Sequence, residues 1–286
     1  MKQREDSQMG SPRPSTSLRG VTDAGRVVAA TTKREVRLVA LGAVPLVREG
    51  DDLCELILGA LARSGEALVS GDVLVIAQKI VSKASGRYVD LAGVTPSARA
   101  LELARVVDKD PRIIELILSE SSEVLRARRD VLVVVHRSGF VMANAGIDLS
   151  NAESSEGRTR VLLLPLDPDR DCERLRDALR RHTGAKVGVV INDSHGRAWR
   201  NGTVGVAIGA SGIPALLDLR GRPDLFGRPL RITQVGLADE LAAAASLLMG
   251  QADEGTPVVL VRGLRSECHK GRAADLIRPR ELDLFR

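Results

Sequence analysis

Aromatic residues are scarce in this sequence. Phe, Trp and Tyr together make up 2% of its 286 residues. Proteins that bind single-stranded nucleic acid stack bases on exposed rings, so this scarcity argues against a platform of that kind. Cysteine is also rare: Cys54, Cys172 and Cys268 form no CxxC pair. A small, odd and scattered set of cysteines indicates reduced thiols rather than a disulfide framework.

Long apolar runs and several common enzyme motifs are missing too. No run of 18 apolar residues occurs, and the N-terminus lacks the apolar core of a secretory signal, so we expect a cytoplasmic protein that does not enter a membrane. The sequence contains no G-x-x-x-x-G-K-[ST], no G-x-S-x-G and no H-E-x-x-H. Their absence argues against a P-loop NTPase, a serine hydrolase of the nucleophile-elbow type and a zinc protease.

The positive charge lies at the two ends of the chain. The formal net charge is +5, but residues 1–34 carry +4 and residues 262–286 carry +3, which leaves about −2 for residues 35–261. A nucleic-acid-binding body would concentrate Lys and Arg on its folded surface. The charge distribution therefore does not favour nucleic acid as a partner.

The chain divides into three parts by pattern. Residues 1–34 are rich in Ser, Arg, Thr and Gly without periodicity, which predicts a disordered basic leader. Residues 35–264 show regular apolar patterns without an internal repeat and predict one folded domain, and residues 265–286 are expected to form a C-terminal tail.

Apolar patterning predicts a mixed α+β fold. Short continuous apolar runs are typical of buried strands, and apolar residues at i, i+3 and i+4 are typical of amphipathic helices. The predicted strands are Val36–Leu41, Val73–Ala77, Val131–His136, Phe140–Ala143, Val161–Leu164, Val187–Ile191, Leu230–Val235 and Pro257–Val261. The predicted helices are Leu53–Ser64, Ser97–Val107, Pro111–Ser121, Asp171–Thr183 and Leu237–Leu248. Strands and helices alternate irregularly and include a hairpin, which favours this class over a regular doubly wound sheet.

Three polar, glycine-bearing segments could carry chemistry. They are 144–151, 193–197 and 249–255, and each contains Asp, Asn or Gln. Oxygen atoms of these side chains are ligands for hard divalent cations. Any single Asp after a strand can equally form a turn or cap a helix, so only the three segments together indicate a metal site.

The other candidate residues are glycines, lysines and one histidine, and for the glycines and lysines two interpretations are open. Five glycines between Gly196 and Gly212 could let backbone amides approach a phosphate, or could serve turns and close packing. Lys79 and Lys83 follow a predicted buried strand and could contact phosphate, or could be solvated surface residues. His195 is a candidate only through its neighbours Asp193 and Ser194.

Seven blocks of sequence together resemble the coenzyme F420-0:L-glutamate ligase family, the γ-glutamyl ligases of deazaflavin cofactor synthesis. These blocks occur in order between about residues 36 and 264: Val44–Leu46, Ile80–Arg87, Asn144–Asn151, Leu164–Asp169, Asp193–Arg197, Gly205–Gly212 and Leu248–Gln251. The resemblance implies a mixed α/β subunit with mixed and antiparallel sheets, in an intertwined homodimer. Some family members carry a flavin-binding domain after the ligase, and here we expect a stand-alone ligase domain.

The resemblance also implies a reaction and its partners. Members ligate L-glutamate to coenzyme F420-0 and then add further γ-linked glutamates. GTP is the co-substrate, the reaction passes through an acyl phosphate, and GDP and phosphate are released. The implied cofactors are Mg²⁺ or Mn²⁺, with two divalent ions expected, and K⁺ is a further candidate.

Site residues follow from the resemblance position by position. The implied catalytic residues are Lys83, Asp148 and Asp193, and the implied metal ligands are Asp148, Asp193, Ser194 and Gln251. The implied guanine-nucleotide contacts are Ala43, Val44, Pro45, Leu46, Gln78, Lys83, Asn151, Met249, Gly250, Gln251, Ala252, Asp253, Glu254, Gly255 and Thr256.

Two further interpretations stay open at this point. The chain could be a non-catalytic regulator that binds GTP and metal, with the basic leader as an interaction tail. It could also be a ligase that acts on a deazaflavin with a variant tail.

Overall fold

The computed structural model describes residues 34–148, 159–264 and 270–284. By its internal contacts the chain separates into residues 1–34 and residues 35–286, and the second unit is described below. Asn151 and Cys268 lie outside the described residues. Within the described ranges, no helix combines the length and the apolar character that a membrane span requires.

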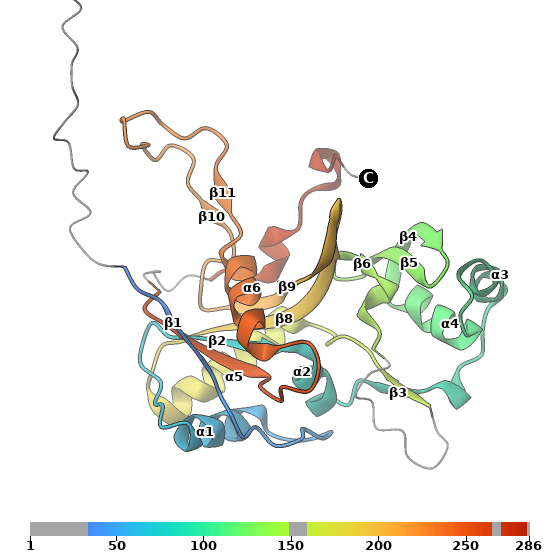
Figure 1. Cartoon of the computed structure of the whole chain (residues 1–286), viewed down its shortest axis with the longest axis horizontal. Coiled ribbons are helices and arrows are strands. Elements are labelled where there is room, and N and C mark those ends of the chain that lie inside the picture. Colours follow the sequence, from blue (N-terminus) through green and yellow to red (C-terminus); the bar gives the residue numbers. More distant parts are fainter. Residues whose placement is uncertain (1–33, 149–158, 265–269, 285–286) are drawn as a thin grey trace, which may run out of the picture. The chain divides into compact units, whose positions relative to one another are not determined.

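A five-stranded sheet forms the centre of the fold (Figure 1). Its strands lie in the order β1 (Arg37–Ala40), β12 (Val258–Arg262), β2 (Val73–Ala77), β8 (Gly188–Arg197) and β9 (Arg200–Ser211). β2 and β8 run parallel, and the other three pairings are antiparallel. β2 reads Val-Leu-Val-Ile-Ala, and such a continuous apolar run suits a strand that is covered on both faces.

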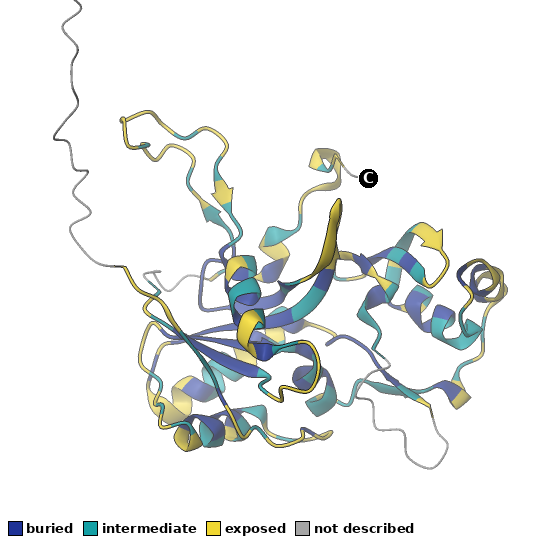
Figure 2. Cartoon of the chain, viewed as in Figure 1, coloured by how far each residue is buried: buried dark blue, intermediate teal, exposed yellow. Residues whose placement is uncertain are grey.

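Helices cover both faces of this sheet. α1 (Leu53–Arg63) and α5 (Pro168–Thr183) lie on one face, and α6 (Leu237–Met249) lies on the other (Figure 1). Successive side chains of a strand point to opposite faces. Leu74 of β2 accordingly packs in the cluster with α1 and α5, whereas Val75 packs with α6. Figure 2 shows the buried strands between these layers.

Capping residues mark where these helices begin and end. The Asp52 side chain caps α1 by accepting hydrogen bonds from the backbone N–H groups of Cys54 and Glu55. α5 begins with Pro168 at its first turn and ends at Gly184, whose φ of 74° suits glycine. A proline at the start and a glycine just past the end are both favoured in α-helices.

A smaller module joins the central sheet through α2 (Gln78–Ala84) and β3 (Tyr88–Asp90). It contains α3 (Ala98–Val107), α4 (Pro111–Ser119), β4 (Ser121–Arg128), β5 (Val131–His136) and β6 (Val141–Ala143). β4, β5 and β6 form an antiparallel sheet, and β3 pairs with β7 (Arg160–Leu162). α3 and α4 pack on the β4–β5 pair around buried apolar residues. β10 (Leu217–Asp218) and β11 (Gln234–Val235) form the base of an extended arm (Figure 1).

Strand register brings four chain segments to one edge of the central sheet. Ala77 at the end of β2 is paired with Asn192 in β8. Val258 at the start of β12 is paired with Ile76, and Ala40 at the end of β1 is paired with Val259. Four segments therefore meet at this edge: the residues after β1, those after β2, those before β12, and residues 192–197 of β8, called the outer half of β8 below.

The expected α+β class is confirmed, with differences in individual elements. The polar stretch after β2, for which the sequence predicted no element, is a helix, α2. Residues 121–128 form β4, which apolar patterning did not predict, because its side chains are half-buried or exposed. Of the strand expected at Leu230–Val235, only Gln234–Val235 is strand, and β8 continues past Ile191 to Arg197.

Packing explains two glycines of the run, Gly205 and Gly209. Both belong to β9. A Cβ atom on Gly205 would overlap Ser246 and the carbonyl oxygen of Ala242 on α6, and one on Gly209 would overlap Pro168 on α5. These glycines let both helices approach the sheet closely, which is the packing alternative.

Replacement of Gly205 tests this packing. Gly205→Ala should lower the free energy of unfolding by about 1–3 kcal/mol, because the added methyl group has no space against α6. Gly196→Ala on the paired strand is the control, since a Cβ added there would have no atom within 4 Å; it should change stability by less than about 0.5 kcal/mol. Urea unfolding of both variants measures the difference, and equal stabilities would contradict it.

Candidate functional site

A cavity of about 650 Å³ opens at this edge of the central sheet. Its walls come from five segments: 44–47 after β1, α2, 142–148, 192–196 in β8, and the loop 249–257 between α6 and β12. Because the cavity lies in the size range of small-molecule sites, it can take a nucleotide-sized ligand.

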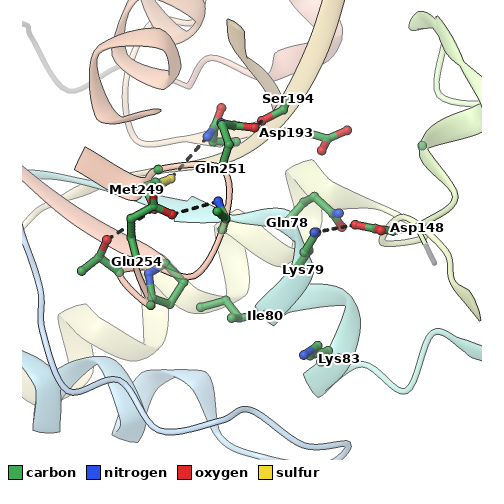
Figure 3. A pocket seen from close by; sticks show the side chains of 18 of the residues that line it. Gln78, Lys79, Ile80, Lys83, Asp148, Asp193, Ser194, Met249, Gln251 and Glu254 are labelled. Carbon is green, nitrogen blue, oxygen red and sulfur yellow. Dashed lines mark hydrogen bonds and ion pairs between the residues drawn. The ribbon is translucent and has the colours of Figure 1, made fainter. Parts of the chain in front are cut away.

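α2 begins at the end of β2 and turns two lysines toward the cavity. The Gln78 side chain is buried, and its Oε1 accepts a hydrogen bond of 3.0 Å from the Ser82 hydroxyl. The next residue, Lys79, forms an ion pair in which its Nζ lies 2.6 Å from Asp148 Oδ2 (Figure 3). Lys83 lies one helical turn further along and also lines the cavity.

Backbone pairing fixes the position of Asp148. Its N–H donates to the Leu162 carbonyl at 3.0 Å, and the Leu162 N–H donates back at 2.9 Å. Just before it, Asn144 accepts a hydrogen bond from the Leu132 N–H at 3.0 Å. Gly146 has a φ of 65°, and a Cβ there would overlap Leu164. This tight turn carries the Asp148 carboxylate to the cavity wall.

The outer half of β8 supplies three adjacent polar side chains. Asp193 and His195 lie two residues apart and therefore share one face of the strand; His195 Nε2 lies 3.1 Å from Asp193 Oδ2. Phe140 contacts the buried His195 ring edge-on, at 6.3 Å between centroids. Between the two, Ser194 donates a hydrogen bond of 2.8 Å to Gln251 Oε1.

The buried side chain of Asn192 links β8 to α6. Asn192 donates through Nδ2 to the Ser246 hydroxyl at 3.2 Å and to Met249 Sδ at 3.3 Å. Its Oδ1 is buried and has no hydrogen-bond partner among the described residues. On α6, Asp239 accepts from the Ala207 N–H at 2.9 Å, and burial raises the pKa of this carboxyl, while the nearby His195 acts in the opposite direction.

The loop after α6 depends on a glycine conformation. Gly250 has φ 70° and ψ −172°, a region that only glycine adopts readily. Glu254 folds back to accept a hydrogen bond of 2.8 Å from the Ala252 N–H, and this backbone contact lowers the pKa of Glu254. Thr256 donates to the Leu248 carbonyl at 2.8 Å and holds the far end of the loop against α6.

The donor set suits a hard divalent cation. Among the described residues, four carboxylates and two lysines line the cavity, so these walls carry net negative charge. Asp148, Asp193, Ser194 and Gln251 offer carboxylate, hydroxyl and amide oxygens. No three His, Cys, Asp or Glu side chains cluster as a metal cage in the described ranges. Mg²⁺ is typically held by one or two carboxylates together with substrate phosphates, so these residues fit Mg²⁺ or Mn²⁺ bound with a nucleotide and do not fit a zinc cage.

Nearly all the residues expected from sequence line this one cavity. Lining residues among them are Val44, Pro45, Leu46, Gln78, Lys83, Asp148, Asp193, Ser194 and Met249–Thr256. Ala43 is not in the lining, and its carbonyl accepts a hydrogen bond from Arg63 at 2.9 Å. Asn151 lies outside the described residues. Sequence reasoning missed the pairing of Lys79 and the contribution of Asn192 and Met142, since no motif marks them.

Comparison with known proteins assigns the family. The model of the F420-0:gamma-glutamyl ligase family matches residues 42–263. The chain belongs to this family. The resemblance that the seven blocks indicate is therefore confirmed.

Curated relatives match over nearly their whole length. The coenzyme F420:L-glutamate ligase of Methanothermobacter thermautotrophicus is 47% identical over 256 residues, which cover 88% of this chain and 99% of that protein. The ligase of the same name from Methanopyrus kandleri is 50% identical over 250 residues, covering 85% and 96%. That of Methanocaldococcus jannaschii is 41% identical over 256 residues, covering 89% and 98%.

Two glycines of the α6–β12 loop give a matched test of its conformation. In Gly250→Ala the backbone conformation would be strained, and the Glu254 carboxylate, which the new methyl group would overlap, would have to leave its bond with the Ala252 N–H. We expect a loss of about 2–4 kcal/mol of unfolding free energy. Gly255→Ala, at φ 66° with the added Cβ in ordinary contact with the Asp253 carbonyl oxygen at 3.9 Å, should cost only about 1–2 kcal/mol. Urea unfolding compares the two; a Gly250→Ala variant as stable as Gly255→Ala would contradict the described loop.

Proposed function

We propose that the chain is a GTP-dependent ligase that joins L-glutamate to coenzyme F420-0 and adds further γ-linked glutamates. Family membership and the names of the curated relatives support the class of reaction. The observation that carries the proposal is the convergence of the candidate metal ligands, two lysines and the glycine-dependent loop on a single cavity.

The chemistry explains why such a site needs these groups. A carboxylate is a poor acyl donor, so the terminal phosphoryl group of GTP is first transferred to the carboxylate of F420-0. The amine of L-glutamate then attacks the acyl phosphate, the amide bond forms, and phosphate leaves; GDP is the other product. Phosphoryl transfer depends mainly on positioning and on neutralisation of phosphate charge.

Each group then has a role that its position supports. Asp148, Asp193, Ser194 and Gln251 would hold Mg²⁺ or Mn²⁺, up to two ions, and K⁺ is a further candidate. A divalent ion there supplies charge neutralisation at the phosphate oxygens. Lys83 contributes an ammonium at the α2 wall of the cavity, where it can contact phosphate as a point charge.

The nucleotide would lie between the segment after β1 and the α6–β12 loop. Val44–Leu46 present an apolar wall, and the loop Met249–Thr256 presents backbone groups and the Glu254 carboxylate. The buried Gln78 also lines the cavity, between these two segments. An apolar wall with a few fixed polar groups is the usual form of a site for a planar base.

Asp193→Asn tests the proposed reaction. This change keeps the size of the side chain and removes its charge, so glutamylation of F420-0 with GTP should fall about 100-fold or more while unfolding stays near wild type. Asp108→Asn is the control, because Asp108 is 67% exposed and ends α3 away from the cavity. For each variant, the assay measures GDP release and the amount of glutamylated product in the same reaction.

Two results would change the assignment. Normal turnover of Asp193→Asn would contradict the role of Asp193. A wild-type protein that binds GTP and Mn²⁺ and forms no product would favour the regulator, or a variant tail on the deazaflavin.

We also propose a homodimer. The arm that extends from β10 and β11 exposes Leu225, Phe226 and Ile232, at 78%, 85% and 87% of their surface, and exposed apolar groups on a protruding arm are typical of an interface. Light scattering should give a mass twice the 30.6 kDa of the chain, and Phe226→Asp should shift it toward one copy. A monomeric wild type would contradict this.

A further inference from the structure

Lys79 holds one of the candidate metal ligands, although no motif assigns Lys79 a role. Its Nζ lies 2.6 Å from Asp148 Oδ2. The Lys79 side chain is 36% exposed and that of Asp148 is 21% exposed, so water screens the pair less than it screens a surface ion pair. Figure 3 shows the two side chains directed toward each other across the cavity wall.

The fold fixes Lys79 in this position. α2 begins directly after β2, and Ile80 and Val81 turn one face of the helix into the core cluster that also contains residues of α1 and α5. Lys79 therefore faces the segment that ends at Asp148. Lys83, four residues further along the same helix, makes no ion pair with a described residue, and Figure 3 shows it apart from the Lys79–Asp148 pair. The same helix thus presents two lysines, of which only Lys79 is held by a candidate ligand.

We propose that Lys79 is a resident counter-ion of Asp148 that competes with a divalent cation for this carboxylate. The proposal rests on the proposed function, which makes Asp148 a ligand. An ammonium at 2.6 Å and a divalent ion on the same carboxylate repel each other, because both are positive. Cation binding at Asp148 therefore favours movement of Lys79 away from this carboxylate.

When a divalent cation displaces the Lys79 ammonium from Asp148, the ammonium takes a second position. Its flexible four-carbon stem lets the ammonium swing while α2 stays fixed. The cavity that Lys79 lines is the one in which the phosphates of a nucleotide would lie, and an ammonium released from Asp148 is attracted to them. Loading of the cation and capture of the phosphates are then coupled through one side chain.

Binding of Mn²⁺ alone, without nucleotide, tests this competition in the full chain. Titrations followed by electron paramagnetic resonance would compare wild type, Lys79→Met, Lys79→Arg and Lys83→Met. Lys79→Met should bind Mn²⁺ about three- to tenfold more tightly, since it removes the competing charge and keeps most of the stem. Lys79→Arg, which keeps the charge, should match wild type or bind more weakly. Lys83→Met removes the same charge from the same helix and should change the affinity by less than about twofold.

A second background separates direct competition from a general charge effect. In Asp148→Asn, Mn²⁺ binding should weaken, and the added Lys79→Met change should no longer strengthen it. Thermal unfolding of every variant confirms that it is folded before titration. Persistence of the full Lys79→Met gain in the Asp148→Asn background would overturn the competition.

The remaining outcomes separate this inference from the proposed function. If Asp148→Asn weakens Mn²⁺ binding but Lys79→Met leaves it unchanged or weaker, the counter-ion role is overturned and the metal site stands. If Asp148→Asn leaves Mn²⁺ binding at the wild-type level, the assignment of Asp148 as a ligand fails and the counter-ion role fails with it, whereas the proposed ligase function is decided separately by the Asp193→Asn assay.

Discussion

The parallel pairing of β2 with β8 is the constraint on which the candidate site depends. Because Ala77 is paired with Asn192, the first residue of α2 lies beside the Asp193–Ser194 pair, which stays in the sheet through the pairing of β8 with β9. A slip of one residue would exchange the faces to which Asp193 and Ser194 point. β12, antiparallel to β2, begins at the same edge and places the α6–β12 loop against both. The cavity is therefore a consequence of register in the central sheet.

Electrostatic features of the cavity follow from the same arrangement. Carboxylates from the small module, from β8 and from the α6–β12 loop gather at one place, and the part of the lining that the structure describes supplies two lysines to offset them. Lys79 neutralises one carboxylate directly, and Ser194 is held by Gln251. The Oδ1 of Asn192, which has no partner among the described residues, and the glycine conformation at Gly250 are locally unfavourable. The apolar layers on both faces of the sheet stabilise the fold enough to tolerate them.

Much of this could be predicted from sequence, for identifiable reasons. Val73–Ala77 is a strand in the structure with the predicted bounds, because a short continuous run of apolar residues favours a buried strand. α1 begins where Asp52 provides a cap. Polar residues after buried strands correctly marked Asp148 and Asp193 as neighbours of one cavity. The polar, glycine-bearing segment 249–255 was marked in the same way, and the family resemblance added the expectation that it contacts a nucleotide.

Other features depend on tertiary contacts that no local pattern encodes. β4 is half-exposed and lacks an apolar run, so patterning did not distinguish it from the end of α4. Gly205 and Gly209 of β9 are required by the approach of α6 and α5, which is visible only when the helices are in place. Lys79 has the sequence signature of an ordinary surface lysine, and its partner comes from the segment 144–148, a distant part of the chain.

Mass spectrometry of the deazaflavin is the most direct test of the central claim that this cavity ligates glutamate to F420-0. The purified protein would be incubated with F420-0, L-glutamate, Mn²⁺ and GTP, with ATP replacing GTP in a parallel reaction. The account predicts successive additions of one glutamyl residue with GTP and little or none with ATP. Absence of any glutamylated product in both reactions, from folded protein that binds GTP, would contradict it.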